Sequence, residues 1–265
     1  MMNIFWREMK ASRKALIIWS VCMFLLVASG MGKYTAYSAG GAGNEVFNQM
    51  PASLKALLGI GSLDVTVMSG FFALLFLYIE LTAGIHAVLL GSSIIAKEER
   101  DKTAEFLMAK PVSRRAVITA KLLAALVNVI VLNLVTLLSS LVMVSAYNKG
   151  KDVTAEIVWF LLSMLVVQLI FLALGALLAA CLRNPKAPGG IAAAILVGSF
   201  VISKITDLAE QLSVLNVLVP FKYFSYTRIV EGSGLHPGII ALSLLLAAGL
   251  TVLTYYFYGK RELSV

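Results

Sequence analysis

The sequence predicts an all-α membrane protein with six transmembrane helices, and three observations lead to this fold class. The 265-residue chain is 60% hydrophobic and 14% charged, whereas soluble domains are about 45–50% apolar and about 25% charged. Its apolar runs reach the roughly 20 residues that a membrane-spanning helix needs. The short alternating segments typical of a transmembrane barrel are missing from the sequence. Residues 1–265 are therefore predicted to form a single transmembrane domain.

Six spans can be placed along the chain. They are expected at Ala15–Met31, Val65–Ile95, Ala116–Tyr147, Ile157–Leu182, Ala187–Ile205 and Gly238–Tyr258. The second and third are longer than 30 residues, so they must tilt or continue as helix beyond the bilayer. Cys22 and Cys181 both lie in apolar runs and are predicted to be unpaired packing residues.

Residues 1–14 are predicted to form an amphipathic helix lying in the membrane interface. One helical face is apolar and consists of Met2, Phe5, Trp6 and Met9. The opposite face is polar and consists of Asn3, Arg7, Lys10 and Lys14. The alternative is a secretory signal cleaved at Ala28-Ser29-Gly30. Cleavage would leave an odd number of spans, so the interfacial helix is favoured.

The distribution of basic residues predicts the orientation. With the N-terminus in the cytoplasm, 15 of the 22 Lys and Arg residues fall on the cytoplasmic side, as the positive-inside rule requires. Six spans return the C-terminus to that side. The net charge of +8 is thereby explained without nucleic acid as a partner, and a bacterial cytoplasmic membrane is the expected location.

Two segments on the outer side have predicted structure. Pro51–Gly59 combines a proline at a first helical position with a closing glycine, which indicates a short surface helix. Residues 206–237 contain an apolar stretch that is too short to span the bilayer. We expect them to form a re-entrant or surface hairpin before the last span.

The cytoplasmic segment 96–115 holds the densest charge cluster in the chain. Residues 97–110 are read as an amphipathic helix that Pro111 stops, with Ser113 capping the next helix. A solvated loop is the plainer interpretation. However, this segment contains four acids, which the positive-inside rule does not need. They are Glu98, Glu99, Asp101 and Glu105. Mixed charge around an apolar Phe-Leu-Met group is typical of a docking surface.

These residues resemble the cytoplasmic loop of ABC-2 type transporter permeases. The matching pattern is Glu99-Arg100-x-x-Thr103-x-Glu105-Phe106-Leu107-x-x-x-Pro111-Val112-Ser113-Arg114, followed by Lys121. Lys102 stands where the family commonly has glycine, and Phe106-Leu107 replaces a pair of leucines. The six spans, the N-terminal helix and the outer hairpin also agree with the family's plan.

The resemblance implies that this loop is a coupling helix seated on a separate ATP-binding subunit. Two such subunits and a second permease chain, identical or homologous, would complete the transporter within membrane lipid. The implied contact residues are Glu98, Glu99, Thr103, Glu105, Phe106, Leu107 and Pro111, and Arg114 would face acidic groups of the ATPase or lipid phosphates.

No nucleotide or cofactor site is expected on this chain, so ATP and Mg would belong to the partner ATPase. Gly32-Lys33-Tyr34-Thr35 lacks the first glycine and the Ser or Thr of a phosphate loop, and it faces outward. The two histidines, His86 and His236, are isolated from any further metal ligand or nucleophile pattern. An enzyme working within the membrane is therefore disfavoured.

Two residues of the second span are weaker candidates for a substrate pathway. Glu80 lies in the middle of that span, where a charge costs roughly 2.5–3.5 kcal/mol on insertion scales. It shares a helical face with Gly84, Ala87 and Gly91, which favours a helix–helix or subunit interface. His86 lies about 120° away around the helix, so it is not a ready partner for Glu80.

The predicted function is the permease subunit of an ATP-driven exporter, coupled to its ATPase through residues 98–111. A membrane anchor that docks a cytoplasmic partner without transport is the first alternative. A secondary transporter is the second, although the inverted repeats that it would favour are not detected.

Overall fold

The computed structural model describes residues 2–38, 49–51, 54–55, 63–103, 105 and 112–261. Within these ranges the chain is all-α, and six helices are long and apolar enough to cross a membrane. They are α1 (Met2–Met31), α5 (Met68–Arg100), α7 (Arg114–Tyr147), α8 (Thr154–Cys181), α9 (Pro188–Leu208) and α11 (Pro237–Lys260). The predicted all-α fold with six spans is confirmed. The ends of the predicted spans agree with the ends of the helices to within a few residues, except at the start of α1.

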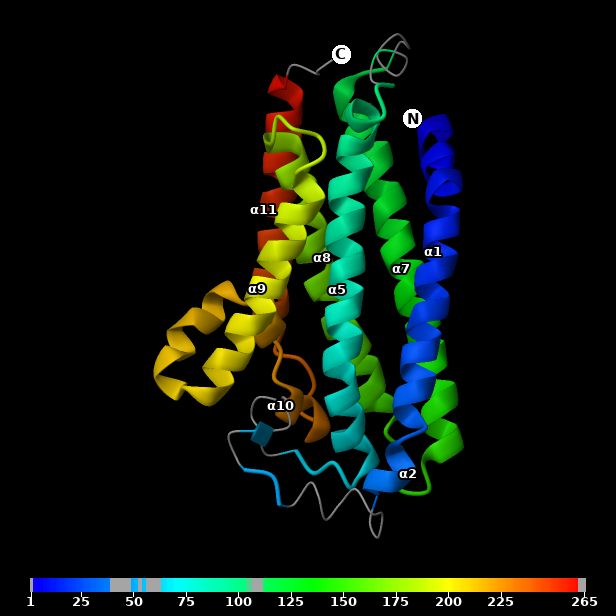
Figure 1. Ribbon diagram of the computed structural model, residues 1–265, viewed down its shortest axis with the longest axis vertical. Helices are drawn as coiled ribbons and strands as arrows, with labels where there is room; N and C mark the ends of the chain where they lie inside the picture. Colours follow the sequence, from blue (N-terminus) through cyan, green and yellow to red (C-terminus); the bar gives the residue numbers. More distant parts are fainter. Residues whose placement is uncertain are drawn as a thin grey trace.

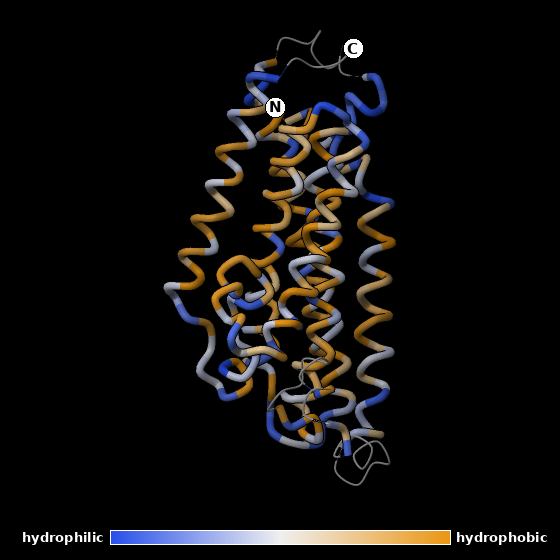
Figure 2. Tube along the Cα trace, turned by 60° about the vertical axis from the view of Figure 1, so that its left-hand side comes forward, coloured by the Kyte–Doolittle hydropathy of each residue, from blue (hydrophilic) through white to orange (hydrophobic). Residues whose placement is uncertain are grey.

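The six helices run side by side in one elongated bundle (Figure 1). α8 packs mainly against α5 and α11, and α1 packs mainly against α7. The start of α1, the end of α5, the start of α7 and the end of α11 meet at one end of the bundle, which we call the terminal end. Hydrophobic residues dominate the middle of the bundle, and hydrophilic residues gather toward its two ends (Figure 2).

The N-terminal residues do not form a separate interfacial helix. Met2–Met31 is one continuous helix of 30 residues, about 45 Å long at 1.5 Å per residue, so it extends beyond the roughly 30 Å hydrocarbon core. No proline or glycine interrupts residues 2–29. Ile4 packs against Val117 and Ala120 of α7, which holds the first turns of α1 upright against the bundle. Trp6 stays exposed, as an interfacial residue would.

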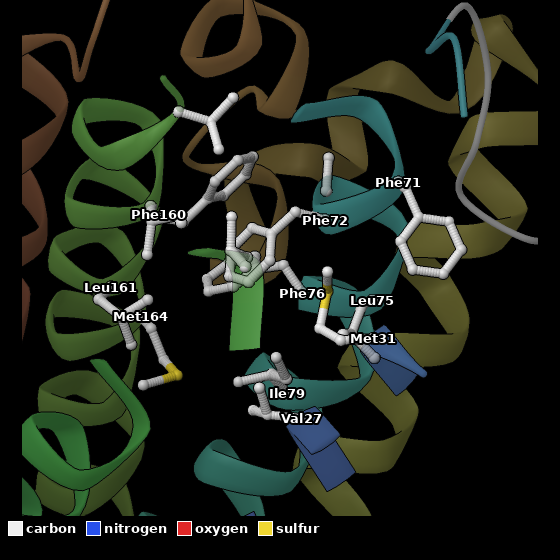
Figure 3. Close-up of a cluster of buried hydrophobic side chains, with 14 of the residues drawn as sticks. Val27, Met31, Phe71, Phe72, Leu75, Phe76, Ile79, Phe160, Leu161 and Met164 are labelled. Carbon is white, nitrogen blue, oxygen red and sulfur yellow. The ribbon is translucent and has the colours of Figure 1, made fainter. Parts of the chain in front are cut away.

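The largest apolar cluster lies at the end of the bundle opposite the terminal end. Aromatic rings of α5 and α8 meet there, and the centroids of Phe76 and Phe160 are 4.7 Å apart. Phe72 packs beside them, and Val27 and Met31 of α1 close the other side (Figure 3). This cluster holds α1, α5 and α8 together at that end of the bundle.

Glycines set the close approach of α5 to α8. A Cβ at Gly91 would lie 2.1 Å from the carbonyl oxygen of Leu172, and a Cβ at Gly175 would lie 2.3 Å from that of Val88. Both distances are impossible for real atoms, so only glycine allows the two backbones to meet. The small-residue face predicted along the second span is thus a helix–helix interface within the chain.

The segment between α9 and α11 folds back against the bundle. It contains the 3₁₀ segments η1 (Glu210–Leu218) and η2 (Pro220–Lys222) and the short helix α10 (Tyr226–Val230). η1 bulges away from the bundle beside α9 (Figure 1), whereas Phe221, Phe224 and Ile229 are buried in it. α2 (Tyr34–Tyr37) follows α1. The predicted surface helix Pro51–Gly59 falls mostly outside the described residues.

Candidate functional site

A buried group of charged residues lies at the terminal end, where α5 ends and α7 begins. Its centre is Lys121 of α7, whose side chain is fully buried. The Lys121 ammonium donates to the carboxylate of Glu98 and to the carbonyl oxygen of Ile94. Because α5 carries both acceptors, this lysine fastens the end of α5 to the start of α7.

α1 joins the same group through Glu8, which is 1% exposed. Its carboxylate accepts hydrogen bonds from Lys97 and, at 3.1 Å, from Arg7. It also lies 3.9 Å from the Lys121 ammonium. Arg7 spans the two acids by donating to Glu98 at 2.9 Å. We call these five residues the charged network. Two acids and three bases share the network, so each buried carboxylate has a cationic partner, as burial requires.

The end of α11 is bound to α5, α7 and α8. Arg261 donates to the carboxylate of Glu99 on α5 and to the carbonyl oxygen of Ala179 on α8. Arg114, the first residue of α7, donates to the carbonyl oxygens of Gly259 at 3.3 Å and Arg261 at 2.6 Å. Such contacts satisfy carbonyl groups that a helix end leaves without partners.

Three of the proposed contact residues therefore face inward. Glu98 and Glu99 are buried against basic partners of this chain, and Arg114 binds the end of α11. The predicted helix 97–110 is also divided, because residues 97–100 are the last turn of α5. Glu98 pairs with Lys121, and Glu99 pairs with Arg261. These bases are far from the two acids along the chain, so the pairs could not be recognised from the sequence.

α5 ends in a Schellman motif. The amide of Thr103 donates to the carbonyl of Glu98 at 2.7 Å, and the amide of Lys102 donates to that of Glu99 at 3.2 Å. Lys102 itself has a φ of 54°, the left-handed conformation that this motif usually gives to glycine. Glycine is common at this position in the family because glycine adopts this backbone conformation without strain.

The remaining predicted contact residues begin at Thr103, the last residue of this turn. Thr103 and Glu105 are exposed, as a docking role would need. Phe106, Leu107 and Pro111 lie outside the described residues, and their contact role stays a prediction. Ser113 caps α7, because its side chain accepts from the amide of Ala116 at 3.2 Å, as predicted.

Glu80 has a partner from the segment between α9 and α11. Its side chain is 2% exposed, and it accepts a hydrogen bond from the hydroxyl of Tyr226 on α10. Burial, and the negative charge of Glu80, raise the pKa of Tyr226 above its ordinary value, so this hydroxyl stays a donor. The Tyr226 ring packs edge-on against Phe76 and Phe160. Glu80 therefore anchors the hairpin to the bundle.

His86 faces a different neighbour. Its ring lies edge-on to Trp19 of α1, with centroids 5.3 Å apart, and its Nδ1 atom is buried without a hydrogen-bond partner among the described residues. Glu80 and His86 do not form a pair. Another polar contact joins three helices, because Asn133 of α7 donates to Gln168 of α8 and Gln168 donates to the carbonyl of Ala83 on α5 at 3.2 Å.

The chain matches the family described as ABC-2 family transporter protein over residues 2–263. It belongs to this family. A comparison with curated proteins gives no significant match. The family and the six apolar helices make the chain a multi-pass membrane transport permease.

The sequence did contain a signal for the charged network of this ABC-2 permease. Lys121 stands five residues into the predicted third span, and a buried lysine in a membrane helix needs an acidic partner. Glu8 is the only acid among the first 44 residues, which sets it apart in a basic segment. Tyr226 carried no comparable signal, because a tyrosine in an outer loop is unremarkable.

Proposed function

We propose that this chain is the permease subunit of an ATP-driven exporter in a bacterial cytoplasmic membrane. The terminal end of the bundle would face the cytoplasm, with both ends of the chain on that side. ATP and Mg would bind to two copies of a separate ATPase subunit. A second permease chain, identical or homologous, would complete the substrate pathway.

The proposal rests on the contacts that the two ends of the segment 96–115 make. Both of its ends enter the charged residues at the terminal end, α5 through Glu98 and Glu99 and α7 through Arg114 and Lys121. Glu98 contacts α1, Arg114 contacts α11, and Arg261, which binds Glu99, also binds α8. A force applied to the segment therefore reaches five of the six long helices through direct contacts.

The mechanism follows from this attachment. Closure of the ATPase pair would displace the segment 96–115. Because the ion pairs of the charged network join α5, α7 and α1, these three helices would move together. Breaking a buried pair costs about 3–5 kcal/mol, so the helix ends resist separation during the movement. The spans would then open the pathway alternately to the two sides of the membrane.

The docking residues are proposed to begin at Thr103, the last residue of the Schellman motif. Thr103 and Glu105 are exposed and would form the polar rim, while Phe106, Leu107 and Pro111 would supply the apolar anchor. Glu98, Glu99 and Arg114 would support the segment from beneath. The alternative of a non-transporting anchor would use the same surface, and only transport separates the two.

The test is co-purification. The tagged chain is purified in mild detergent, and the proteins bound to it are identified by mass spectrometry. We expect an ATP-binding subunit in a one-to-one ratio, and its loss when Phe106→Ala and Leu107→Ala are combined. The control variant Lys149→Ala changes an exposed residue at the opposite end and should retain the subunit. If the double variant retained it equally, residues 98–111 would not be the docking site.

A further inference from the structure

A cavity of about 330 Å³ opens beside α5 in the half of the bundle nearest the terminal end. It is lined by residues of α1, α5 and α7, by the connection between α8 and α9, and by the first two residues of α9. Leu16, Trp19 and Leu89 supply apolar walls. Its volume is within the range of small-molecule sites, about 300–1,000 Å³.

The charges around this cavity have one sign. Arg100 and Lys186 line it, and none of the described residues in its lining is acidic. Arg100 contacts Asp101 at 3.0 Å, so its charge is partly balanced, whereas Lys186 is exposed and has no ion pair among the described residues. An anionic group at the level of these two side chains would be attracted.

A polar atom without a partner lies deeper in the same lining. His86 is 4% exposed, and its Nδ1 atom has no hydrogen-bond partner among the described residues. An unpaired buried polar group costs about 1–3 kcal/mol, so a ligand that offers a partner gains this amount on binding. An imidazole nitrogen can donate or accept according to its tautomer.

We propose that this cavity binds an anionic amphiphile, with its acidic headgroup at Arg100 and Lys186, its apolar chain against Leu16, Trp19 and Leu89, and a polar group farther along that chain at His86. The proposal rests on the proposed function, because it names the substrate class of the same permease. The amphiphile is either a phospholipid of the membrane or the exported molecule, and the two share an acidic headgroup and an apolar chain.

Two adjacent glycines provide a matched test of the site. Gly189 lines the cavity, and a Cβ there would have ordinary contacts of 3.6 Å with Ser92 and 3.8 Å with Leu89. Gly190 is the next residue of α9, and a Cβ there would meet nothing within 4 Å. Gly189→Leu should therefore fill the cavity, whereas Gly190→Leu makes the same chemical change outside it.

The probe is radiolabelled dodecyl phosphate, measured by equilibrium dialysis against the full chain in phosphatidylcholine nanodiscs. We expect saturable binding at one site per chain. Gly189→Leu should weaken binding about tenfold or more, because a packed interior has no spare room, and Gly190→Leu should leave it unchanged. Equal binding by the two variants would overturn the proposal, since it would show partition into the lipid alone.

Charge is tested separately from shape. Lys186→Gln should weaken dodecyl phosphate binding about threefold, the effect of one exposed charge, and Lys149→Gln at the opposite end should not. His86→Phe keeps a ring beside Trp19. It should weaken binding of 12-hydroxydodecyl phosphate about tenfold by removing the polar partner, and leave binding of dodecyl phosphate unchanged. If dodecyltrimethylammonium bound as tightly as dodecyl phosphate, the anionic class would be wrong.

The source of the amphiphile is distinguished by what the purified chain carries. A phospholipid bound at one per chain in the Gly190→Leu variant, and missing in Gly189→Leu, would assign the site to membrane lipid. ATP-dependent release of dodecyl phosphate from the assembly with its ATPase would assign it to exported cargo. Binding to the chain alone needs no ATPase, so failure of this proposal and failure of the proposed function give different results.

Discussion

At the scale of single residues, the buried ion pairs of Lys121 are expected to contribute strongly to the stability of the fold. Its side chain is fully buried, and it contacts Glu98 and Glu8 from two other helices. Lys121→Met would leave an apolar group of similar length beside two buried carboxylates. We expect this variant to destabilise the fold by about 3 kcal/mol, as removal of one member of a buried pair does.

The measurement for Lys121→Met is thermal unfolding in detergent, compared with the wild-type chain. Lys149→Met is the matched control, because Lys149 is exposed at the opposite end and its loss should leave the midpoint unchanged. Combining Lys121→Met with Glu98→Gln should recover part of the loss. Equal midpoints for the two single lysine variants would contradict the network.

Lys102 carries backbone strain at the end of α5. Its φ of 54° is a left-handed conformation, which disfavours a side chain by about 1 kcal/mol. Lys102→Gly should therefore strengthen the Schellman motif, and hydrogen exchange at the Lys102 and Thr103 amides should slow about fivefold. Lys102→Val should accelerate the same exchange. Faster exchange in the glycine variant would show that the turn is not held by this motif.

At the scale of elements, the contact between α5 and α8 depends on glycine. Gly91→Ala would place a methyl group 2.1 Å from a backbone oxygen of α8, so the helices must separate. We expect a loss of about 1–3 kcal/mol, typical of overpacking. Gly198→Ala on α9 meets nothing within 4 Å and should not destabilise the fold, because alanine favours a helix more than glycine does. Unfolding midpoints in detergent compare the two, and an unaffected Gly91→Ala would refute close packing at this position.

The helices themselves could be predicted from the sequence, because its long apolar runs end at charged residues, proline or glycine. α9 begins at Pro188 and α7 follows the cap Ser113, and both starts were predictable from local chemistry. The N-terminal helix was not, because amphipathic residues 2–14 fit an interfacial helix equally well. The difference comes from Glu8 and Ile4, whose partners lie more than 80 residues away along the chain.

At the scale of the whole molecule, two cysteines can report the orientation. Cys181 is exposed at the end of α8 that lies near Arg261, and Cys22 is exposed on α1. In the Cys22→Ala background, a membrane-impermeant maleimide should label Cys181 only after the cells are permeabilised. A cysteine introduced as Lys149→Cys should be labelled in intact cells. The reverse pattern would place the terminal end outside.

The site was only partly predictable. The mixed charge of residues 98–105 singled out the segment, whose docking role stays a prediction, but the sequence gives no way to divide its acids between a partner protein and the chain itself. Glu98 and Glu99 turned inward because Lys121 and Arg261 need anionic partners, whereas Glu105, beyond the turn at Lys102, is exposed. That division depends on tertiary contacts between distant helix ends.

The central claim is that a separate ATPase drives this permease through residues 98–111. The most direct measurement is the rate of ATP hydrolysis by the assembly purified on the tagged chain. We predict hydrolysis with the wild-type chain, and loss of most of it when Phe106→Ala and Leu107→Ala are combined while the chain stays folded. A folded wild-type chain without hydrolysis in several detergents, or equal hydrolysis by both proteins, would contradict the account.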